Sequence, residues 1–484
     1  MTRISFGSRI TTLAEQDLDA PAVVCDDATL TRGQLERAAN RLARVYAEHG
    51  VGVGDLVTLC LPNGIDFFVH SLAAWKLGAV PNPLSARLPR RERDVIVKRA
   101  DPALLIGIPD DEASGRPTLA ARFEPDESVS DAPHPDRTAP HERALASGGS
   151  TGVPKLILPM HPGSYDPDAP SELFHSHTAT LVPGPLYHAV PFSAAWQAIL
   201  GGAKAIVLPR FDASCCLEQI ERHRIDRAFF VPTMLLRIWR LPEAERIAHD
   251  LSSLEFVMTG GAPMPAWLMR AWIEWLGPDV MNEAFGPSER IGGTRINGRE
   301  WLEHPGSVGR PSVGSKIRIL DPDSGRDLAP GEMGEIYMMP ATGSGSTYRY
   351  VGARAMRNEE GWETVGDMGW LDGDGYLFLG DRRCDMILTG GRNVYPAEVE
   401  AALEEHPAVR SSCVIGLPDE DLGNVIHAIL ETAEAVSDDA LREHLADRLA
   451  RHKLPRSFER VDEPLRDDAG KLRRSALRAE RISG

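Results

Sequence analysis

The sequence predicts an α/β protein with a large N-terminal domain of mostly parallel sheets flanked by helices and a small α+β C-terminal domain. Three observations lead to this fold class. The chain has 484 residues, which is more than one hydrophobic core usually serves. Strand-like and helix-like patterns alternate through the first half, and the character of the sequence changes near residue 380. We therefore place the two domains at residues 1–380 and 381–484.

The first elements show the alternation clearly. Thr31 and Gln34 have the spacing of a capping box, in which each side chain bonds the backbone N–H of the other residue at the start of a helix. Residues 56–61 are continuously apolar and predict a buried strand, residues 65–79 predict a helix, and residues 103–108 predict another strand. Strands separated by helices are typical of a parallel sheet whose faces the helices cover.

The middle of the chain resumes this pattern after an irregular stretch. Residues 109–140 contain six prolines and many acidic residues without periodicity, which indicates a surface connection. Apolar segments predict parallel strands at residues 203–209, 227–232 and 253–260, and a more antiparallel sheet at residues 315–320 and 334–340.

The last hundred residues have the composition of a separate small domain. A helix is expected to begin near Pro396, because proline is favoured in the first turn of a helix. Strand-like segments follow at residues 413–417 and 427–431, and a second helix is predicted at residues 438–451. We find no internal repeat and no long low-complexity tract.

Composition excludes several classes of protein. The net charge of −17 disfavours binding to nucleic acids and to anionic membranes. No apolar run approaches the ~18 residues of a membrane-spanning helix, and the N-terminus lacks a secretory apolar segment. The six cysteines form no C-x-x-C pair, and Cys215 and Cys216 are adjacent, so we expect reduced thiols, no structural zinc and a cytoplasmic location.

The sharpest local motif is SGGSTGVPK, from Ser147 to Lys155. Its glycines let backbone N–H groups approach an anion, its hydroxyls add donors, and its lysine adds a positive charge. Only seven of the 53 cationic residues are lysines, so a lysine inside a motif is informative. The motif predicts a polyphosphate site, although a flexible polar turn fits the same residues equally well. It is not a Walker loop, because no Ser or Thr follows the lysine. The candidate phosphate-binding residues are Ser147, Gly148, Gly149, Ser150, Thr151, Gly152 and Lys155.

This motif and four later ones, taken in order, resemble the adenylate-forming superfamily, which includes acyl-CoA synthetases, aryl-acid ligases and luciferases. The resemblance covers nearly the whole chain, and the SGGSTG variant is most similar to aryl-acid and bile-acid-like CoA ligases. It implies a β-barrel-like part in the large domain and a mobile C-terminal domain. It also implies ATP, Mg²⁺ and coenzyme A as cofactors.

Two motifs are similar to the family's adenine and metal sites. TGGAPM resembles the adenine-binding turn, which implies contacts from Gly260, Gly261, Ala262 and Pro263, although a tight strand-to-helix turn needs the same glycines. NEAFGPSE resembles the motif that follows. Phe285 would stack on adenine next to Gly286, Ser288 would bond the α-phosphate, and Glu289 would bind Mg²⁺. A carboxylate beside phosphates requires a divalent cation between the like charges.

Two further segments resemble the family's ribose and hinge motifs. Asp367 would accept hydrogen bonds from both ribose hydroxyls, and Arg382 would contact the ribose as well. The hinge position, usually Asp or Lys, is occupied by Cys384 in this chain. Gly390 and Gly391 would let the pantetheine arm of coenzyme A pass close to the backbone.

Lys471, His188 and Glu289 are the residues to which the resemblance assigns catalytic roles. Lys471 matches the C-terminal catalytic lysine. An ammonium ~4 Å from two approaching anions offers about 4 kcal/mol at an effective dielectric near 20. His188 matches a residue near the substrate carboxylate, although a lone histidine more often has a structural role.

The resemblance implies that the protein converts a carboxylic acid to its acyl adenylate and then to a coenzyme A thioester, with the C-terminal domain turning between the steps. The absence of an acidic residue between Pro183 and Trp196 disfavours an amino acid substrate, because a buried ammonium would be unpaired. We expect a bulky alicyclic, polycyclic or aryl acid. Small side chains would leave room for it and two aromatic ones would line its pocket. These are Ala194, Ala195, Gly292 and Gly293, and Phe192 and Trp196.

Three alternatives remain open at this point. The enzyme would stop at the adenylate, or it would pass the acyl group to a carrier-protein thiol. A non-catalytic nucleotide-binding partner subunit belongs to a different class, and a P-loop-like NTPase or kinase is disfavoured by the spacing of the motif. The sequence leaves the oligomeric state undetermined.

Overall fold

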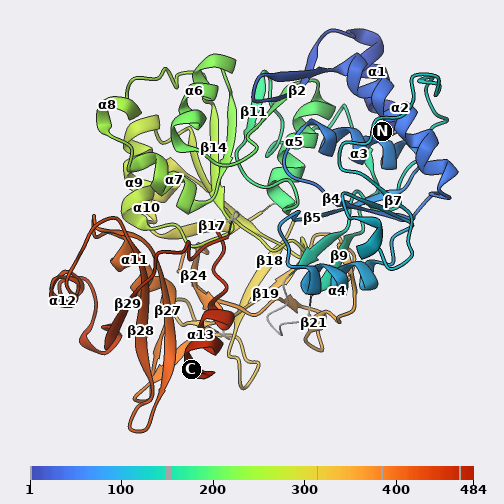
Figure 1. Ribbon diagram of the computed structural model, residues 1–484. Coiled ribbons are helices and arrows are strands. Elements are labelled where there is room, and N and C mark those ends of the chain that lie inside the picture. Colours follow the sequence, from blue (N-terminus) through green and yellow to red (C-terminus); the bar gives the residue numbers. More distant parts are fainter. Residues whose placement is uncertain (1–2, 148–153, 313, 383–384, 468–469, 484) are drawn as a thin grey trace.

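The computed structural model describes residues 3–147, 154–312, 314–382, 385–467 and 470–483. Figure 1 shows the small C-terminal domain, in orange and red, packed beside one end of the large N-terminal domain. The α/β fold class and the division into a large and a small domain are confirmed. Within the described part of the chain, no helix is long and apolar enough to cross a membrane.

The centre of the N-terminal domain is a parallel sheet. Its strands lie in the order β2 (Pro21–Cys25), β12 (Lys204–Val207), β11 (Ala179–Val182), β13 (Arg227–Phe230), β14 (Phe256–Gly260) and β15 (Met281–Phe285), with β3 (Ala28–Thr31) antiparallel at the edge. The predicted strands at residues 203–209, 227–232 and 253–260 are therefore confirmed. The helices that alternate with these strands are α5 (Ala189–Gly201), α6 (Ala213–His223), α7 (Pro232–Trp239), α8 (Glu243–Arg246) and α9 (Ala266–Leu276).

The same sheet continues as antiparallel strands beyond β15. In order these are β16 (Thr294–Asn297), β17 (Ser307–Pro311), β24 (Leu377–Arg382), β23 (Asp367–Leu371), β19 (Gly334–Met339), β22 (Glu363–Thr364) and β21 (Met356–Arg357), with β18 (Lys316–Leu320) paired to β19. α10 (Gly298–Glu303) lies between β16 and β17 in the chain. The described strands form an open path, so the expected β-barrel-like part is not a closed barrel.

A second parallel sheet lies near the N-terminus. Its order is β5 (Val80–Leu84), β4 (Leu56–Cys60), β6 (Leu104–Ile106) and β7 (Thr118–Leu119), and its helices are α3 (Ile65–Lys76) and α4 (Arg90–Ala100). The N-terminal segment adds β1 (Ile4–Ser5), paired with β10 (Ser164–Tyr165), and α1 (Phe6–Gln16). The predicted capping box is present, with Thr31 at the N-cap of α2 (Arg32–Glu48) and Gln34 bonding back to it.

The core between α3 and α5 is rich in aromatic side chains. Trp196 packs against Trp75 with ring centroids 4.6 Å apart, and Phe192 packs against Phe67 at 6.0 Å. Phe192 and Trp196 are each 2% exposed. The prediction that these two residues line an acyl pocket is therefore wrong, because they fill the face of α5 that packs on α3.

The C-terminal domain has its own core. α11 (Pro396–Glu404) and α12 (Asp438–Ala446) cover the strands β27 (Val409–Asp419), β28 (Gly423–Thr432) and β29 (Ser457–Arg460), with the hairpin β25 (Ile387–Thr389) and β26 (Arg392–Val394) beside them and α13 (Arg474–Ser483) at the end. This confirms the predicted helix near Pro396 and both strands. The predicted domain boundary between residues 380 and 381 falls inside β24, which is the last strand of the large sheet in chain order.

Candidate active site

The candidate phosphate loop connects two antiparallel strands. β8 (Leu145–Ser147) pairs with β9 (Lys155–Pro159) so that Ser147 is opposite Lys155, and β20 (Tyr348–Val351) pairs with the other edge of β9. The hairpin thus fixes both ends of the loop and places Lys155 at its exit. Five of the predicted phosphate-binding residues lie outside the described residues, namely Gly148, Gly149, Ser150, Thr151 and Gly152.

Lys155 belongs to a polar cluster with Glu289 and Tyr350. The ammonium Nζ of Lys155 lies 2.6 Å from the phenol oxygen of Tyr350 and 3.4 Å from Oε1 of Glu289. Tyr350 in turn donates a hydrogen bond to Oε1 of Glu289. The side chain of Glu289 is only 7% exposed, so its charge is held in place by these two donors. Burial, and then the charge of Glu289, raise the pKa of Tyr350 well above its usual range.

Tyr350 is a site residue that sequence reasoning missed. It comes from β20, which pairs antiparallel with β9, and it is opposite Ile157 in that pairing. The only signal in the sequence is the alternation of Tyr348 and Tyr350, which places both on one face of a strand. Such a pattern is ordinary in strands, so it does not by itself identify a functional residue.

The candidate adenine turn follows β14. A Cβ atom on Gly260 would lie 2.4 Å from the carbonyl oxygen of Ala284, and Gly261 has a φ of +80°. Strand packing and turn geometry alone therefore require both glycines. Phe285 ends the neighbouring strand β15 and is half-buried, while Gly286 is exposed and Ser288 is half-buried. The turn and the NEAFGPSE motif are thus brought side by side, at the carboxyl ends of adjacent parallel strands, where ligands commonly bind in such sheets.

Near this edge lie Glu283, which was not predicted, and the two predicted ribose contacts Asp367 and Arg382. Glu283 on β15 is 5% exposed, and burial raises its pKa to about 8. It is opposite Thr259 in the pairing of β14 with β15. Asp367 and Arg382 occupy paired positions on β23 and β24, so the backbone brings together the two residues predicted to contact ribose.

His188 belongs to the N-terminal domain and is influenced by a charge from the C-terminal domain. It is the N-cap residue of α5, and its Nε2 is buried without a hydrogen-bond partner among the described residues. Its pKa is lowered to about 3, mainly by burial and then by the charge of Lys471. Lys471 therefore lies close enough to His188 to act on it electrostatically, and it does so from the C-terminal domain.

The loop that carries Lys471 docks against α7. Gly470 is buried and has a φ of +74°, and a Cβ atom on it would lie 2.6 Å from Oγ1 of Thr233 and 3.0 Å from Val231. A side chain at this position would push the loop away from the N-terminal domain. Ala262 and Pro263 of the candidate adenine turn border a cavity of about 20 Å³ that Glu404 and Arg466 of the C-terminal domain also line. The two domains thus close over the candidate adenine turn.

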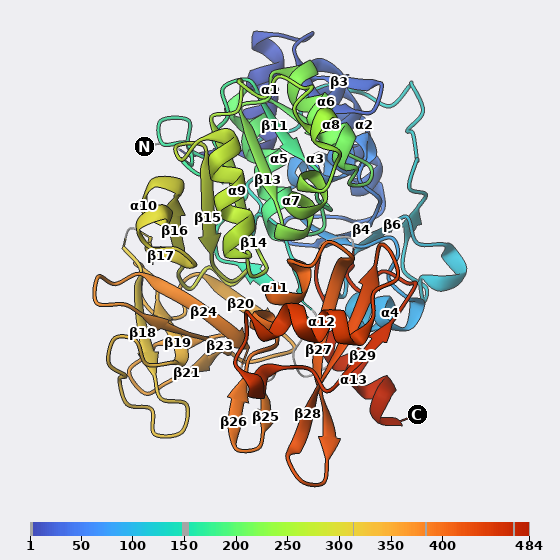
Figure 2. The same ribbon diagram turned by 90° about the vertical axis from the view of Figure 1, so that its left-hand side faces the viewer.

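Gly390 and Gly391 lie away from this meeting point. They form the two-residue turn of the β25–β26 hairpin, with φ values of +53° and +74°, as a type I′ turn requires. The N–H of Gly390 donates to the carbonyl of Leu422 within the same domain. Figure 2 shows this hairpin at the end of the C-terminal domain opposite α7. The predicted hinge residue Cys384 lies outside the described residues.

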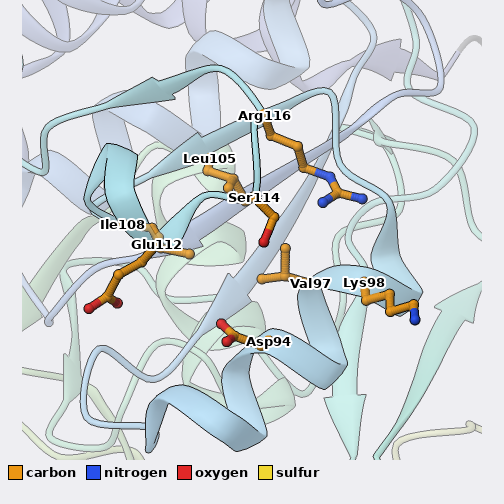
Figure 3. Close-up of a pocket in the computed structure, with 8 residues that line it drawn as sticks. All are labelled: Asp94, Val97, Lys98, Leu105, Ile108, Glu112, Ser114 and Arg116. Atoms are coloured by element: carbon orange, nitrogen blue, oxygen red, sulfur yellow. The ribbon is translucent and has the colours of Figure 1, made fainter.

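Two other features lie apart from these residues. A cavity of about 330 Å³ opens between α4 and residues 105–116, and Figure 3 shows Asp94, Lys98, Glu112 and Arg116 around it. None of the predicted site residues lines this cavity. His304, Asp372 and Asp374 bring ligand atoms within 4.8 Å of one another, but Oδ1 of Asp372 already accepts from the backbone N–H groups of Asp374 and Tyr376. Asp372 and Asp374 belong to the hydrogen-bonded turn between β23 and β24, and His304, at the end of α10, contacts Oδ2 of Asp372.

A large α/β domain with a candidate phosphate loop, against which a small domain docks, is typical of nucleotide-dependent enzymes of two domains. The chain belongs to the AMP-binding enzyme family. The profile of that family matches residues 10–344, and the profile of the AMP-binding enzyme C-terminal domain matches residues 398–471.

Characterised relatives are similar to this chain over almost its whole length. A feruloyl-CoA synthase from Amycolatopsis sp is 32% identical, with 99% of each chain covered. A 2-succinylbenzoate–CoA ligase from Bacillus licheniformis is 30% identical, with 96% of this chain and 98% of the relative covered. The structure of the o-succinylbenzoate CoA synthetase of Bacillus subtilis in complex with its acyl-adenylate intermediate matches with a TM-score of 0.81 and 26% identity, covering 99% of this chain and 98% of that one.

Proposed function

We propose that the protein is an AMP-forming acyl-CoA ligase. It would join a carboxylic acid to ATP, giving an acyl adenylate and pyrophosphate, and then transfer the acyl group to coenzyme A. The observation that carries this proposal is the docking of the loop that leads to Lys471, whose Gly470 packs against Val231 and Thr233 of the N-terminal domain, with the charge of Lys471 contributing to the lowered pKa of His188. The relatives support it, because the similar enzymes are named as CoA ligases and one similar structure holds an acyl adenylate.

In the first half-reaction, an oxygen of the substrate carboxylate attacks the α-phosphorus of ATP, and the bond from that phosphorus to the pyrophosphate oxygen breaks. Both reactants are anions, so a fixed ammonium at Lys471 stabilises the charge that gathers as they meet. His188 stays neutral because of its lowered pKa, and its unpartnered Nε2 is able to donate to the carboxylate when it carries the ring proton.

The residues around Glu289 fit a magnesium ion bound with ATP. Magnesium in such sites is held by one or two carboxylates together with phosphate oxygens, and the buried carboxylate of Glu289 would supply one such ligand. When bound, the ion would neutralise phosphate charge. Lys155 would bind a phosphate oxygen, and Tyr350 would keep the Glu289 carboxylate oriented.

The second half-reaction requires a different arrangement of the domains. A thiol attacks the acyl carbon of the adenylate, a carbon–sulfur bond forms, and AMP leaves with the electrons of the carbon–oxygen bond. The Gly390–Gly391 turn, proposed to admit the pantetheine arm, lies far from α7 in the present arrangement. We propose that the C-terminal domain turns about residues 380–385, which withdraws Lys471 and brings this turn to the acyl group.

The substrate is proposed to be a bulky alicyclic, polycyclic or aryl acid. Ala194 lies on the face of α5 opposite the aromatic core and packs with Phe229 and Met258, next to the half-buried Ala284. The small side chain of Ala194 at this place supports a wide acyl group, whereas the predicted Ala195 lies in the same core cluster as Phe192 and Trp196 and gives no such support. Gly292 and Gly293 offer no such support, because the space beside them is already filled. A Cβ atom on Gly292 would lie 3.1 Å from Met338, and one on Gly293 would lie 2.7 Å from a backbone carbonyl oxygen.

A panel of acids in an ATP–pyrophosphate exchange assay tests this proposal. We expect exchange with cyclic and aryl acids to exceed exchange with linear fatty acids of equal carbon number at least tenfold. A preference for linear acids would reject the substrate class, and release of phosphate in place of pyrophosphate would reject the reaction.

A second candidate is transfer to a carrier-protein thiol. It is favoured by one relative, a fatty acid–[acyl-carrier-protein] ligase from Streptomyces coeruleorubidus that is 28% identical over 96% of this chain. Trapping the adenylate with hydroxylamine, with and without coenzyme A, followed by mass detection of the thioester, separates the two. Consumption of the adenylate by coenzyme A supports the CoA ligase, and its persistence supports the carrier protein or an enzyme that stops at the adenylate. A non-catalytic subunit would give no hydroxamate.

A further inference from the structure

Arg466 connects the Lys471 loop to the body of the C-terminal domain. Its side chain is 12% exposed, and its guanidinium donates three hydrogen bonds to three different segments. Nη1 donates to the carbonyl of Gly470 at 3.2 Å, Nε to Oγ of Ser411 at 3.1 Å, and Nη2 to Oε1 of Glu404 at 3.1 Å. The first acceptor belongs to the residue before Lys471, and the others belong to β27 and α11.

Asp467 forms two hydrogen bonds with the backbone of Lys471. The N–H of Lys471 donates to Oδ1 of Asp467 at 3.0 Å, and the N–H of Asp467 donates to the carbonyl of Lys471 at 3.0 Å. Leu472 then bridges back to Arg466. The backbone of the lysine therefore has a fixed position relative to Arg466, and Arg466 has a fixed position relative to β27 and α11.

Arg240 of the N-terminal domain completes the connection. It is the C-cap residue of α7, and it donates to the carbonyls of Glu404 at 2.9 Å and Arg410 at 3.1 Å. Glu404 is thus held at its carboxylate by Arg466 and at its carbonyl by Arg240. Figure 2 shows α11 directly below α7, where this contact is made. A continuous series of hydrogen bonds joins α7 to the residue before Lys471.

We propose that Arg466 is the positioning residue for Lys471 and that Arg240 docks the Arg466–Glu404 pair on the N-terminal domain for the adenylation step. The inference rests on the proposed function of Lys471. Arg466 does not touch the reacting atoms. Its planar fork reaches three acceptors at once, which a single ammonium group does not match. A misplacement of a catalytic group by 1 Å is enough to cost about 10²-fold in rate.

The two arginines differ in what a domain rotation does to them. The contacts of Arg466 lie within the C-terminal domain and are kept when the domain turns, whereas the contacts of Arg240 cross between domains and are lost. Neither serves the thioester step, because Lys471 has then left the reacting centre. Both arginines therefore act on adenylation alone.

The test measures the two half-reactions separately. Pyrophosphate exchange reports adenylation, and thioester formation from a chemically prepared acyl adenylate and coenzyme A reports the second step. We expect Arg466→Met to lower exchange about 30- to 100-fold and to leave thioester formation within about threefold of the parent. Arg466→Lys should recover little of the loss. We expect Arg240→Met to lower exchange about tenfold and to leave the thioester step unchanged. Equal losses in both half-reactions would overturn the proposal.

Controls separate positioning from folding. Arg448→Met removes an arginine of the same domain that bonds Glu405 near the surface, and it should change neither half-reaction. Ser411→Ala removes one of the three acceptors and keeps the buried charges paired, so its thermal midpoint should stay near that of the parent while exchange falls about threefold. A folded Ser411→Ala variant with full exchange would count against the proposal.

A double-mutant cycle supplies the decisive readout. If Arg466 acts through Lys471, then Arg466→Met should change exchange less than twofold when Lys471→Ala is already present. Losses that multiply would overturn the proposal, because they would show that Arg466 acts independently. If Lys471→Ala alone leaves exchange unchanged, the proposed function of Lys471 fails together with this inference. If Lys471→Ala abolishes exchange and Arg466→Met does not lower it, only the inference fails.

Discussion

Lys155 and Lys471 are two lysines of one candidate site, and they are held in opposite ways. The ammonium of Lys155 is placed by side chains of its own domain, within 3.4 Å of Glu289 and 2.6 Å of Tyr350. Lys471 is exposed and is placed through its backbone, by a loop that comes from the other domain. Under the proposed rotation of the C-terminal domain, Lys155 would stay at the site throughout, whereas Lys471 would be there only when the domains are arranged as they are here.

This difference gives the two lysines different tasks. A charge that is always present suits a task that lasts through both half-reactions, such as holding the nucleotide. A charge that can be withdrawn suits one step only, and its removal makes room for a thiol. We therefore predict that substitutions around Lys155 and substitutions around Lys471 will differ in which half-reaction they change.

The largest expected effect is that of Lys471→Ala. We expect pyrophosphate exchange to fall about 10²- to 10³-fold, because the variant loses the fixed charge at the developing anion. Thioester formation from a supplied acyl adenylate should stay within about threefold. The two assays on the same preparation check this, and a matching fall in the second assay would contradict the idea that Lys471 is withdrawn.

Glu289→Gln tests the region around Lys155. The substitution removes the negative charge proposed to hold magnesium and leaves the ammonium of Lys155 without its ionic partner. We expect the Mg²⁺ concentration for half-maximal exchange to rise about 10- to 100-fold. A magnesium titration measures this, with Lys471→Ala as the comparison. Lys471→Ala should keep the parent's magnesium requirement, and a shared shift would show that the two regions are not separable.

Tyr350→Phe should have a smaller effect of the same kind. It deletes the phenol that donates to Glu289 and accepts from Lys155, and it keeps the ring. We expect the magnesium requirement to rise about tenfold or less, in line with the loss of one hydrogen bond to a buried charged group. Tyr376→Phe removes a phenol whose bond to Glu300 is 3.5 Å long and distant from the site, and it should leave the titration unchanged.

Much of the fold could be predicted because its signals are local. The capping box at Thr31 and the helix that begins at Pro396 are set by a few neighbouring residues, and both are confirmed. The orientation of α5 could not be predicted in the same way. Its mostly apolar sequence does not show which face meets α3, so the positions of Phe192 and Trp196 were predicted wrongly.

The candidate site was predictable only in part, for a similar reason. Lys155 and Glu289 are 134 residues apart, and a resemblance to a family was needed to put them together. Tyr350 bonds Lys155 and Arg466 bonds Glu404 and Ser411, all partners that are distant in sequence, so a local pattern does not reveal these bonds. Residues that act by positioning another side chain are visible only when the partner's place is known.

The smallest expected effect concerns His188, the point where the two regions meet. Its pKa is about 3 in the folded protein, lowered mainly by burial and then by Lys471, against an ordinary value of 6.5. Between these values the unfolded chain binds a proton that the folded chain does not, so the contribution of His188 to stability falls as the pH falls below about 6.5. His188→Gln should therefore lose about 1 kcal/mol less free energy of unfolding than the parent between pH 6.5 and pH 5.5.

Urea titrations at the two pH values measure this, with His70→Gln as a matched control, because burial also lowers the pKa of His70, to about 4. A parent and a His188→Gln variant with the same pH dependence would show that His188 is not held neutral in the folded protein.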